Sequence, residues 1–116
     1  MRRTDPSRGE VWSVDLNPTV GHAQSGLRPA LVVSVDTFNG GPADLVIVLP
    51  ITKVGKGIPF HVEVQPPEGG LTMRSHIKCE EIRCISKLRL RQRLGAFSDK
   101  TMEAVEDRIK IVLDLH

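Results

Sequence analysis

The chain is poor in aromatic residues: its 116 residues include one tryptophan, three phenylalanines and no tyrosine. A surface that stacks several nucleic-acid bases needs several exposed rings, so an extended stacking platform is excluded. The apolar runs are also short. The longest, residues 30–33 and 45–49, fall far below the roughly 20 residues of a membrane-spanning helix. The basic first residues lead into no apolar stretch, so we expect no signal peptide.

Cysteine is scarce as well. Cys79 and Cys84 fall within one predicted strand, where the geometry of a disulfide is hard to meet. We therefore expect two small, buried, reduced thiols and a cytoplasmic protein. His76, three residues before Cys79, allows a metal site as the less favoured interpretation. No motif specifies a bound cofactor, and we expect none.

Neither sign of charge is in large excess. The chain has 16 lysines and arginines and 14 acidic residues, which gives a net charge of +2. The distribution is less even: residues 74–93 hold seven basic and two acidic residues, a net of +5. Such a segment attracts phosphate groups. However, Arg89, Arg91 and Arg93 also alternate as charges do on a strand edge that resists aggregation. Both interpretations remain open at this point.

The hydrophobic pattern predicts many short strands followed by one helix. We expect strands at residues 10–16, 29–35, 45–52, 60–64, 77–85 and 88–94. Pro50 within the third implies a bulge or a strand edge. Ser98 is suited to cap a helix whose apolar residues recur at helical spacing up to Val112. A chain of this length forms one hydrophobic core, so we expect a single domain over residues 1–116 that folds as a small barrel or strongly curled sheet.

Candidate site residues lie near the ends of the predicted strands. The long polar loop between the first two strands ends at Arg28, whose backbone is restricted by Pro29. The candidates are His22, Gln24, Ser25 and Arg28 in and after this loop, Thr52 and Lys53 after a buried strand, and Lys78 with Glu80. Taken singly, each is more often structural. Thr52 could be a strand-end hydroxyl, His22 a surface histidine and Glu80 the partner of Arg83.

Four segments resemble one protein family. Residues 8–12 (RGEVW), 18–33 (PTVGHAQSGLRPALVV), 48–52 (VLPIT) and 80–85 (EEIRCI) are similar to motifs of the MazF/PemK/Kid toxins. These are the messenger-RNA endoribonucleases of type II toxin–antitoxin systems. With the C-terminal helix, the resemblance covers nearly the whole chain. It favours the RNA-binding interpretation of the basic segment.

The resemblance implies a mainly β fold, a small SH3-like barrel of about five to seven strands with a C-terminal amphipathic helix. It implies a homodimer that cleaves single-stranded RNA without a metal ion, by attack of the 2′-hydroxyl, to leave a 2′,3′-cyclic phosphate and a 5′-hydroxyl. It also implies a MazE-like antitoxin whose acidic C-terminal tail fills the RNA groove. In this scheme Arg28 would clamp the phosphate and Thr52 would hydrogen-bond one of its oxygens.

The resemblance also gives candidates for the acid and the base of the reaction. Lys78 and Glu80 stand where family members carry an Arg-x-Asp segment, so Glu80 would be the base and Lys78 the acid or a phosphate contact. Lying two residues apart, they would share a strand face. His22 matches a histidine of some members and could be the base instead. Ala23 stands where many members carry a glutamate, which could alter the bases that are read.

The remaining expected contacts to substrate lie in the same segments. They are His22, Gln24, Ser25, Lys53, Glu81 and Arg83. The alternative is a non-catalytic relative with the same barrel, either a gyrase-directed toxin of the CcdB kind or a protein-binding module. Such a gyrase poison relies on a C-terminal aromatic residue, and this chain ends in Leu-Asp-Leu-His.

Overall fold

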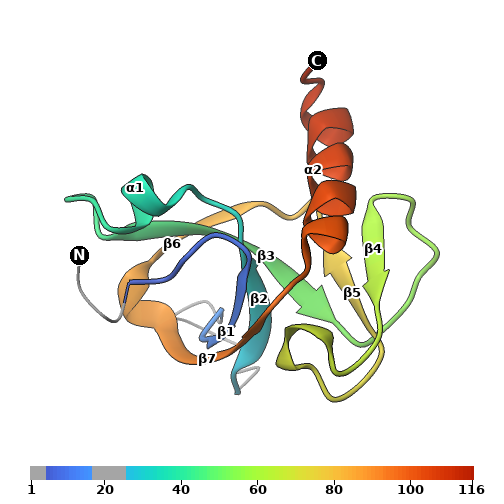
Figure 1. Ribbon diagram of the computed structural model, residues 1–116, viewed down its shortest axis with the longest axis horizontal. Helices are drawn as coiled ribbons and strands as arrows, with labels where there is room; N and C mark the ends of the chain where they lie inside the picture. The colour runs from blue at the N-terminus through green and yellow to red at the C-terminus, as the bar shows by residue number, and fades with distance from the viewer. Residues whose placement is uncertain (1–4, 17–25) are drawn as a thin grey trace, which may run out of the picture.

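The computed structural model describes residues 5–16 and 26–116. In this part the chain forms a seven-stranded antiparallel sheet followed by a long helix (Figure 1). The strands are β1 (Glu10–Val14), β2 (Arg28–Val32), β3 (Leu45–Thr52), β4 (His61–Val64), β5 (Ser75–Lys78), β6 (Arg83–Ser86) and β7 (Leu90–Ala96). The helices are α1 (Asp36–Asn39) and α2 (Asp99–Leu113), with 3-10 turns η1 (Glu68–Gly70) and η2 (Lys87–Arg89).

The strands lie in the order β4-β5-β3-β2-β1-β7, and β6 pairs with β3 beside this path. The expected mainly β class with a C-terminal helix is confirmed. Within the described ranges the two end strands β4 and β7 do not pair with each other, so the sheet is curled and open rather than a closed barrel. Strand β3, at residues 45–52, has the predicted bounds.

Pro50 explains how β3 serves two partners on one edge. That edge pairs with β6 through residues 45–48 and with β5 through residues 51 and 52. Pro50 lies between these two stretches, where its missing N–H breaks no ladder bond, and it pairs with Ala30 of β2 on the other edge. The proline therefore marks the point at which one partner strand replaces the other.

Apolar residues form a core on each face of the sheet. On one face, Met102 and Val105 of α2 pack on a cluster that includes Leu31, Leu49 and Ile77. The predicted cap is confirmed, because the Ser98 hydroxyl accepts a hydrogen bond from the N–H of Thr101. The opposite core contains Val14, Ala30, Val32, Val46, Val48 and Ile85, with Trp12, Leu16 and Leu90 packed against it. In the described part of the chain, neither helix has the length and apolarity to cross a bilayer.

The prediction of one strand over residues 77–85 is wrong. Strand β5 ends at Lys78, a turn follows, and β6 begins at Arg83. The two strands use different stretches of β3, which requires the break. Cys79 and Cys84 therefore do not share a strand. Cys79 is buried, but Cys84 is exposed, which corrects the expectation of two buried thiols.

Candidate active site

Arg28 and Thr52 lie at the same end of two neighbouring strands. Ala30 of β2 is opposite Pro50 of β3 in an antiparallel pair. Arg28 lies two residues before Ala30, and Thr52 lies two residues after Pro50. Because side chains two residues apart on a strand share a face, Arg28 and Thr52 project on the face that carries Ala30 and Pro50.

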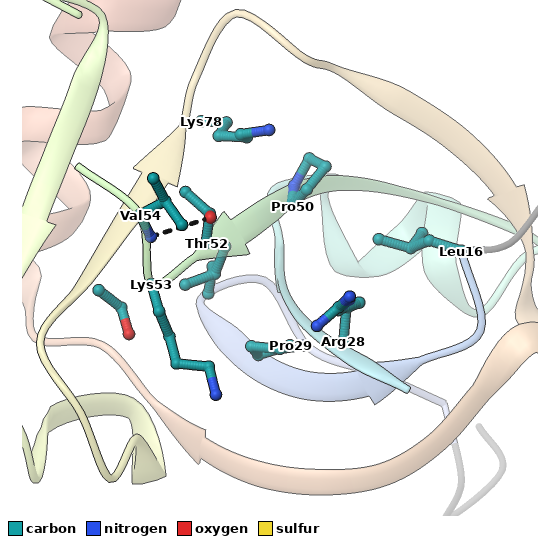
Figure 2. A pocket seen from close by; sticks show the side chains of 10 residues that line it. Leu16, Arg28, Pro29, Pro50, Thr52, Lys53, Val54 and Lys78 are labelled. Carbon is teal, nitrogen blue, oxygen red and sulfur yellow. Dashed lines mark hydrogen bonds between the residues drawn. The ribbon is translucent and has the colours of Figure 1, made fainter. Parts of the chain in front are cut away.

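These residues border a pocket of about 330 Å³ (Figure 2). Ten described residues line it: Leu16, Arg28, Pro29, Pro50, Ile51, Thr52, Lys53, Val54, Ser75 and Lys78. Figure 2 shows that Arg28 reaches it from β2, Thr52 and Lys53 from the end of β3, and Lys78 from the end of β5. The structure therefore brings together four of the residues that the sequence predicted.

The pocket is electropositive. Three of its ten described lining residues, Arg28, Lys53 and Lys78, are basic and none is acidic. The Lys78 ammonium lies 3.2 Å from a carboxylate oxygen of Glu81 outside the lining. Two prolines stiffen the backbone on either side, Pro29 next to Arg28 and Pro50 two residues before Thr52. A rigid, positive hollow of this kind suits a phosphate group.

Thr52 has a hydroxyl that is already oriented. Its Oγ1 accepts a hydrogen bond from the backbone N–H of Val54 at 3.1 Å, drawn as a dashed line in Figure 2. A hydroxyl that accepts one bond still has a proton to donate. Thr52 is thus suited to donate to a phosphate oxygen placed in the pocket.

Glu80 does not share a strand face with Lys78, which corrects the sequence prediction. It lies in the turn after β5, and its Oε2 accepts a hydrogen bond from His61 Nε2 at 3.0 Å. The His61 side chain is only 4% exposed. Glu80 Oε1 and His61 Nδ1 are buried and have no partner among the described residues. Glu80 is also not the partner of Arg83.

Arg83 and Glu81 lie beside the pocket rather than in its lining. Arg83 Nη2 donates to the carbonyl oxygen of Leu16 at 3.3 Å, and Leu16 does line the pocket. Glu81 lies next to the pocket through its ion pair with Lys78. His22, Gln24 and Ser25 lie outside the described residues.

Cys79 is an inert thiol beside this region. Burial raises its pKa to about 12, and the neighbouring Glu80 carboxylate adds to the rise while Arg108 opposes it. No group of three His, Cys, Asp or Glu side chains suited to a metal gathers among the described residues, so His76 and Cys79 are not part of such a group.

Sequence reasoning missed Ser75, Leu16 and His61. Ser75 and Leu16 line the pocket, and His61 is paired in register with Lys78 across β4 and β5. The alternation of apolar residues at positions 12, 14 and 16 could have suggested that Leu16 contributes to the lining. No local signal could have found the other two, because they depend on how β3, β4 and β5 pair.

The chain is similar to known proteins over most of its length. A family model described as a PemK-like, MazF-like toxin of type II toxin–antitoxin systems matches residues 7–113. The chain is 36% identical over 110 residues to the endoribonuclease MazF of Staphylococcus saprophyticus, covering 94% of this chain and 92% of that one. It is 26% identical to a mycobacterial endoribonuclease solved with its cognate antitoxin, with a TM-score of 0.79 and coverage of 96% and 97%. It is 25% identical to a MazE–MazF structure from Deinococcus radiodurans, with a TM-score of 0.82, and the match covers 97% of this chain and 98% of that one.

Proposed function

The chain belongs to the PemK-like, MazF-like family of endoribonuclease toxins of type II toxin–antitoxin systems, and we propose that it cleaves single-stranded messenger RNA at the pocket of Arg28 and Thr52. One observation carries the proposal. Three cations and an oriented hydroxyl, from three separate strands or their ends, border the same hollow. The scissile phosphate would occupy this hollow.

The proposed reaction is attack of the ribose 2′-oxygen on the adjacent phosphorus, with departure of the 5′-oxygen. The products are a 2′,3′-cyclic phosphate and a 5′-hydroxyl. A general base removes the 2′-hydroxyl proton, an acid protonates the departing oxygen, and positive donors stabilise the crowded phosphate. Arg28 supplies the main electrostatic contact, since a guanidinium group stays positively charged and is a poor proton donor. Thr52 donates to a non-bridging oxygen, and Lys78 serves as the acid or as a second phosphate contact.

We propose Glu80 as the base and His22 as the alternative. Support for Glu80 is its Oε1 atom, a buried acceptor without a partner among the described residues. A buried polar atom without a hydrogen-bond partner is rare in proteins, and such atoms commonly have a functional role or bind an ordered water. Glu80 is not among the residues that line the pocket, but it lies two residues after Lys78, which does line it. His22, Gln24, Ser25, Lys53, Glu81 and Arg83 are proposed to contact the RNA around the cleaved bond.

The reaction is proposed to need no metal ion or cofactor. The charge that a divalent ion would place on the phosphate can come from the Arg28 guanidinium and the ammonium groups of Lys53 and Lys78. The non-catalytic alternative, a CcdB-like gyrase poison or a protein-binding module, is less supported. Neither activity needs a basic hollow that combines Arg28 with Thr52.

We further propose a cytoplasmic homodimer that is inhibited by a MazE-like antitoxin. The mycobacterial structure contains an endoribonuclease with its cognate antitoxin, and the Deinococcus structure contains MazE with MazF. An acidic antitoxin tail would be attracted to the basic pocket and would occupy the space of the RNA.

The deciding experiment is cleavage of an RNA pool by purified protein in excess EDTA, with the new RNA ends mapped by sequencing. Arg28→Ala is expected to lower the cleavage rate by about 100- to 1,000-fold, the usual loss on removing one preorganised donor from a developing charge. Lys100→Ala is the matched control, because it removes one positive charge from α2 without touching the pocket lining. Cleavage by Arg28→Ala within tenfold of the parent, or loss of all cleavage in EDTA, would contradict the proposal.

A further inference from the structure

A second pocket contains the chain's single tryptophan. It has a volume of about 580 Å³. Its lining comprises Asp5, Trp12, Asp44, Ser86, Lys87, Leu88, Leu90, Arg91, Gln92 and Arg93. Trp12 is partly exposed and packs against the buried cluster around Val14 and Ala30. The indole therefore rests on the core and borders an open space.

Irregular pairing of β1 with β7 brings an arginine to this indole. Val14 is opposite Leu90 and Trp12 is opposite Arg93, and the register shifts between Ser13 and Val14 and again between Val11 and Trp12. Leu90 and Arg93 are three residues apart, and in a regular strand they would project on opposite faces. The bulges place both on the face that carries Val14 and Trp12.

Glu10 holds the indole and the guanidinium in place. Its Oε1 accepts from Trp12 Nε1 at 3.0 Å and from the Ser7 N–H at 2.8 Å, and its Oε2 accepts from Arg93 Nε at 2.8 Å. Burial alone would raise the pKa of Glu10, but these hydrogen bonds outweigh it and hold the pKa below its usual value. The carboxylate thus stays charged near neutral pH, and both planar groups are oriented before any ligand arrives.

The cations around this pocket are largely compensated. Arg93 is bound to Glu10, Lys87 lies 2.9 Å from Asp5, and Arg91 lies 3.8 Å from Asp15. A phosphate would have to compete with these carboxylates. The flat faces of an indole and a guanidinium instead suit the π-face of a base, which stacks on such groups.

The pocket lies close to the proposed cleavage site. Val14 is opposite Arg28 across β1 and β2. Trp12 is two residues further along β1 on the same face, a shift of about 7 Å along the strand. A strand of RNA with its phosphate at Arg28 can therefore bring a nearby nucleotide to Trp12.

We propose that the Trp12–Arg93 pocket binds one unpaired nucleobase of the RNA, one or a few nucleotides from the cleaved bond. This inference rests on the proposed function, since the RNA strand must be fixed at Arg28. It predicts that the pocket contributes to substrate affinity and sequence preference and takes no part in the chemistry.

The test combines the tryptophan with abasic RNA. The probe is a short RNA that the parent protein cleaves, as identified by end mapping, with one base at a time replaced by an abasic nucleotide. At a single position we expect the abasic change to raise KM about tenfold for the parent, as for loss of one stacked base, with kcat changed less than threefold. For the Trp12→Leu protein, the abasic change at that position should cause no further loss of affinity. Abasic changes at other positions should weaken binding to Trp12→Leu as much as they weaken binding to the parent.

Three controls keep the outcomes distinct. Arg93→Gln should show the same position-specific coupling if Trp12→Leu does not fold, and Lys100→Ala should show none. With the parent protein and RNA that carries a 2′-deoxy nucleotide at the cleaved bond, which cannot be cut, the intact RNA should quench Trp12 fluorescence more than the RNA that is abasic at the coupled position. Cleavage by the parent without coupling at any position would overturn the base pocket and leave the proposed function intact. Quenching by an antitoxin peptide but not by RNA would assign the pocket to the antitoxin, and absence of RNA binding would overturn both proposals.

Discussion

Glu80 Oε2 accepts a hydrogen bond from His61 Nε2 at 3.0 Å, while Glu80 Oε1 stays buried without a partner among the described residues. One oxygen is thus fixed by a histidine that is itself almost fully buried, and the other is a buried acceptor whose hydrogen bond is not made within the described part of the chain. This arrangement can hold a base in a defined orientation at the turn between β5 and β6.

The pH dependence of cleavage distinguishes Glu80 from His22 as the base. We expect Glu80→Gln to lower single-turnover cleavage more than His22→Asn and to change the acidic limb of the profile. An ordinary carboxylate keeps its activity down to about pH 5, whereas an ordinary histidine loses it below about pH 6.5. Rates of the three proteins on a short RNA between pH 4.5 and 9 decide the matter. An inactive His22→Asn beside a fully active Glu80→Gln with the parent profile would reverse the assignment.

Thr52 should contribute less to catalysis than Arg28. We expect Thr52→Val to slow cleavage by about ten- to 100-fold, because a neutral hydroxyl is a weaker donor to phosphate than a guanidinium. The substitution also removes the acceptor of the Val54 N–H, so thermal unfolding must be measured with the rate. Thr52→Ser keeps the hydroxyl and should retain most of the activity. Equal losses in the valine and serine variants would show that the hydroxyl is not the active group.

Antitoxin and RNA should exclude each other at the pocket. An acidic peptide from the antitoxin tail is expected to displace labelled RNA, made uncleavable by a 2′-deoxy nucleotide at the cleaved bond, from the parent protein. The affinity of the peptide should fall as salt rises because screening weakens contacts between charges. Competition binding at low and high ionic strength provides both measurements. Unchanged RNA binding at saturating peptide would mean that the antitoxin does not act by occlusion.

The Glu68 carboxylate at the beginning of α2 should make the free energy of unfolding depend on pH. The Glu68 carboxylate accepts hydrogen bonds from the Ser98 N–H, the Ser98 hydroxyl and the Thr101 hydroxyl. Burial alone would raise its pKa, but these bonds hold the pKa below its ordinary value. The stabilisation is therefore complete above the pKa of the unfolded chain, about 4.3, and is lost as the pH falls through the lower pKa of the folded state.

We expect Glu68→Gln to lower the free energy of unfolding by about 1–2 kcal/mol at pH 7. The difference should shrink towards zero near pH 2.5, where the parent side chain is protonated too. Urea unfolding at both pH values measures it, with Glu103→Gln on the exposed side of α2 as the control. An equal loss at both pH values would indicate a packing defect rather than the loss of a charged acceptor.

The two cysteines should differ in reactivity. Cys84 is exposed, whereas Cys79 is buried with its pKa raised to about 12, and only a thiolate attacks alkylating reagents efficiently. Brief treatment of the folded protein at pH 8 should add one label, at Cys84, and treatment in denaturant should add two. Mass spectrometry counts the labels, and Cys84→Ser should take none when folded. Rapid labelling of Cys79 in the folded state would contradict the burial that the fold assigns to it.

The sequence by itself determined the elements whose signals are local. The run of β-branched and apolar residues at 45–52 predicted β3 with its observed bounds, and Ser98 with the helical spacing behind it predicted α2. Arg28 before a proline and Thr52 at a strand end were identified from chain position and family motifs. Such features depend on neighbours along the chain, so the sequence can report them.

Only the tertiary structure decided which strand edges meet. The break after Lys78 exists because β3 takes β5 and β6 as successive partners on one edge, a fact that no local pattern in residues 77–85 encodes. The pairing of β4 with β5 sets His61 opposite Lys78 and so beside Glu80, 19 residues away in sequence, and the bulged pairing of β1 with β7 sets Arg93 beside Trp12. Register is fixed by burial of whole sheet faces at once, and it therefore depends on residues that are distant along the chain.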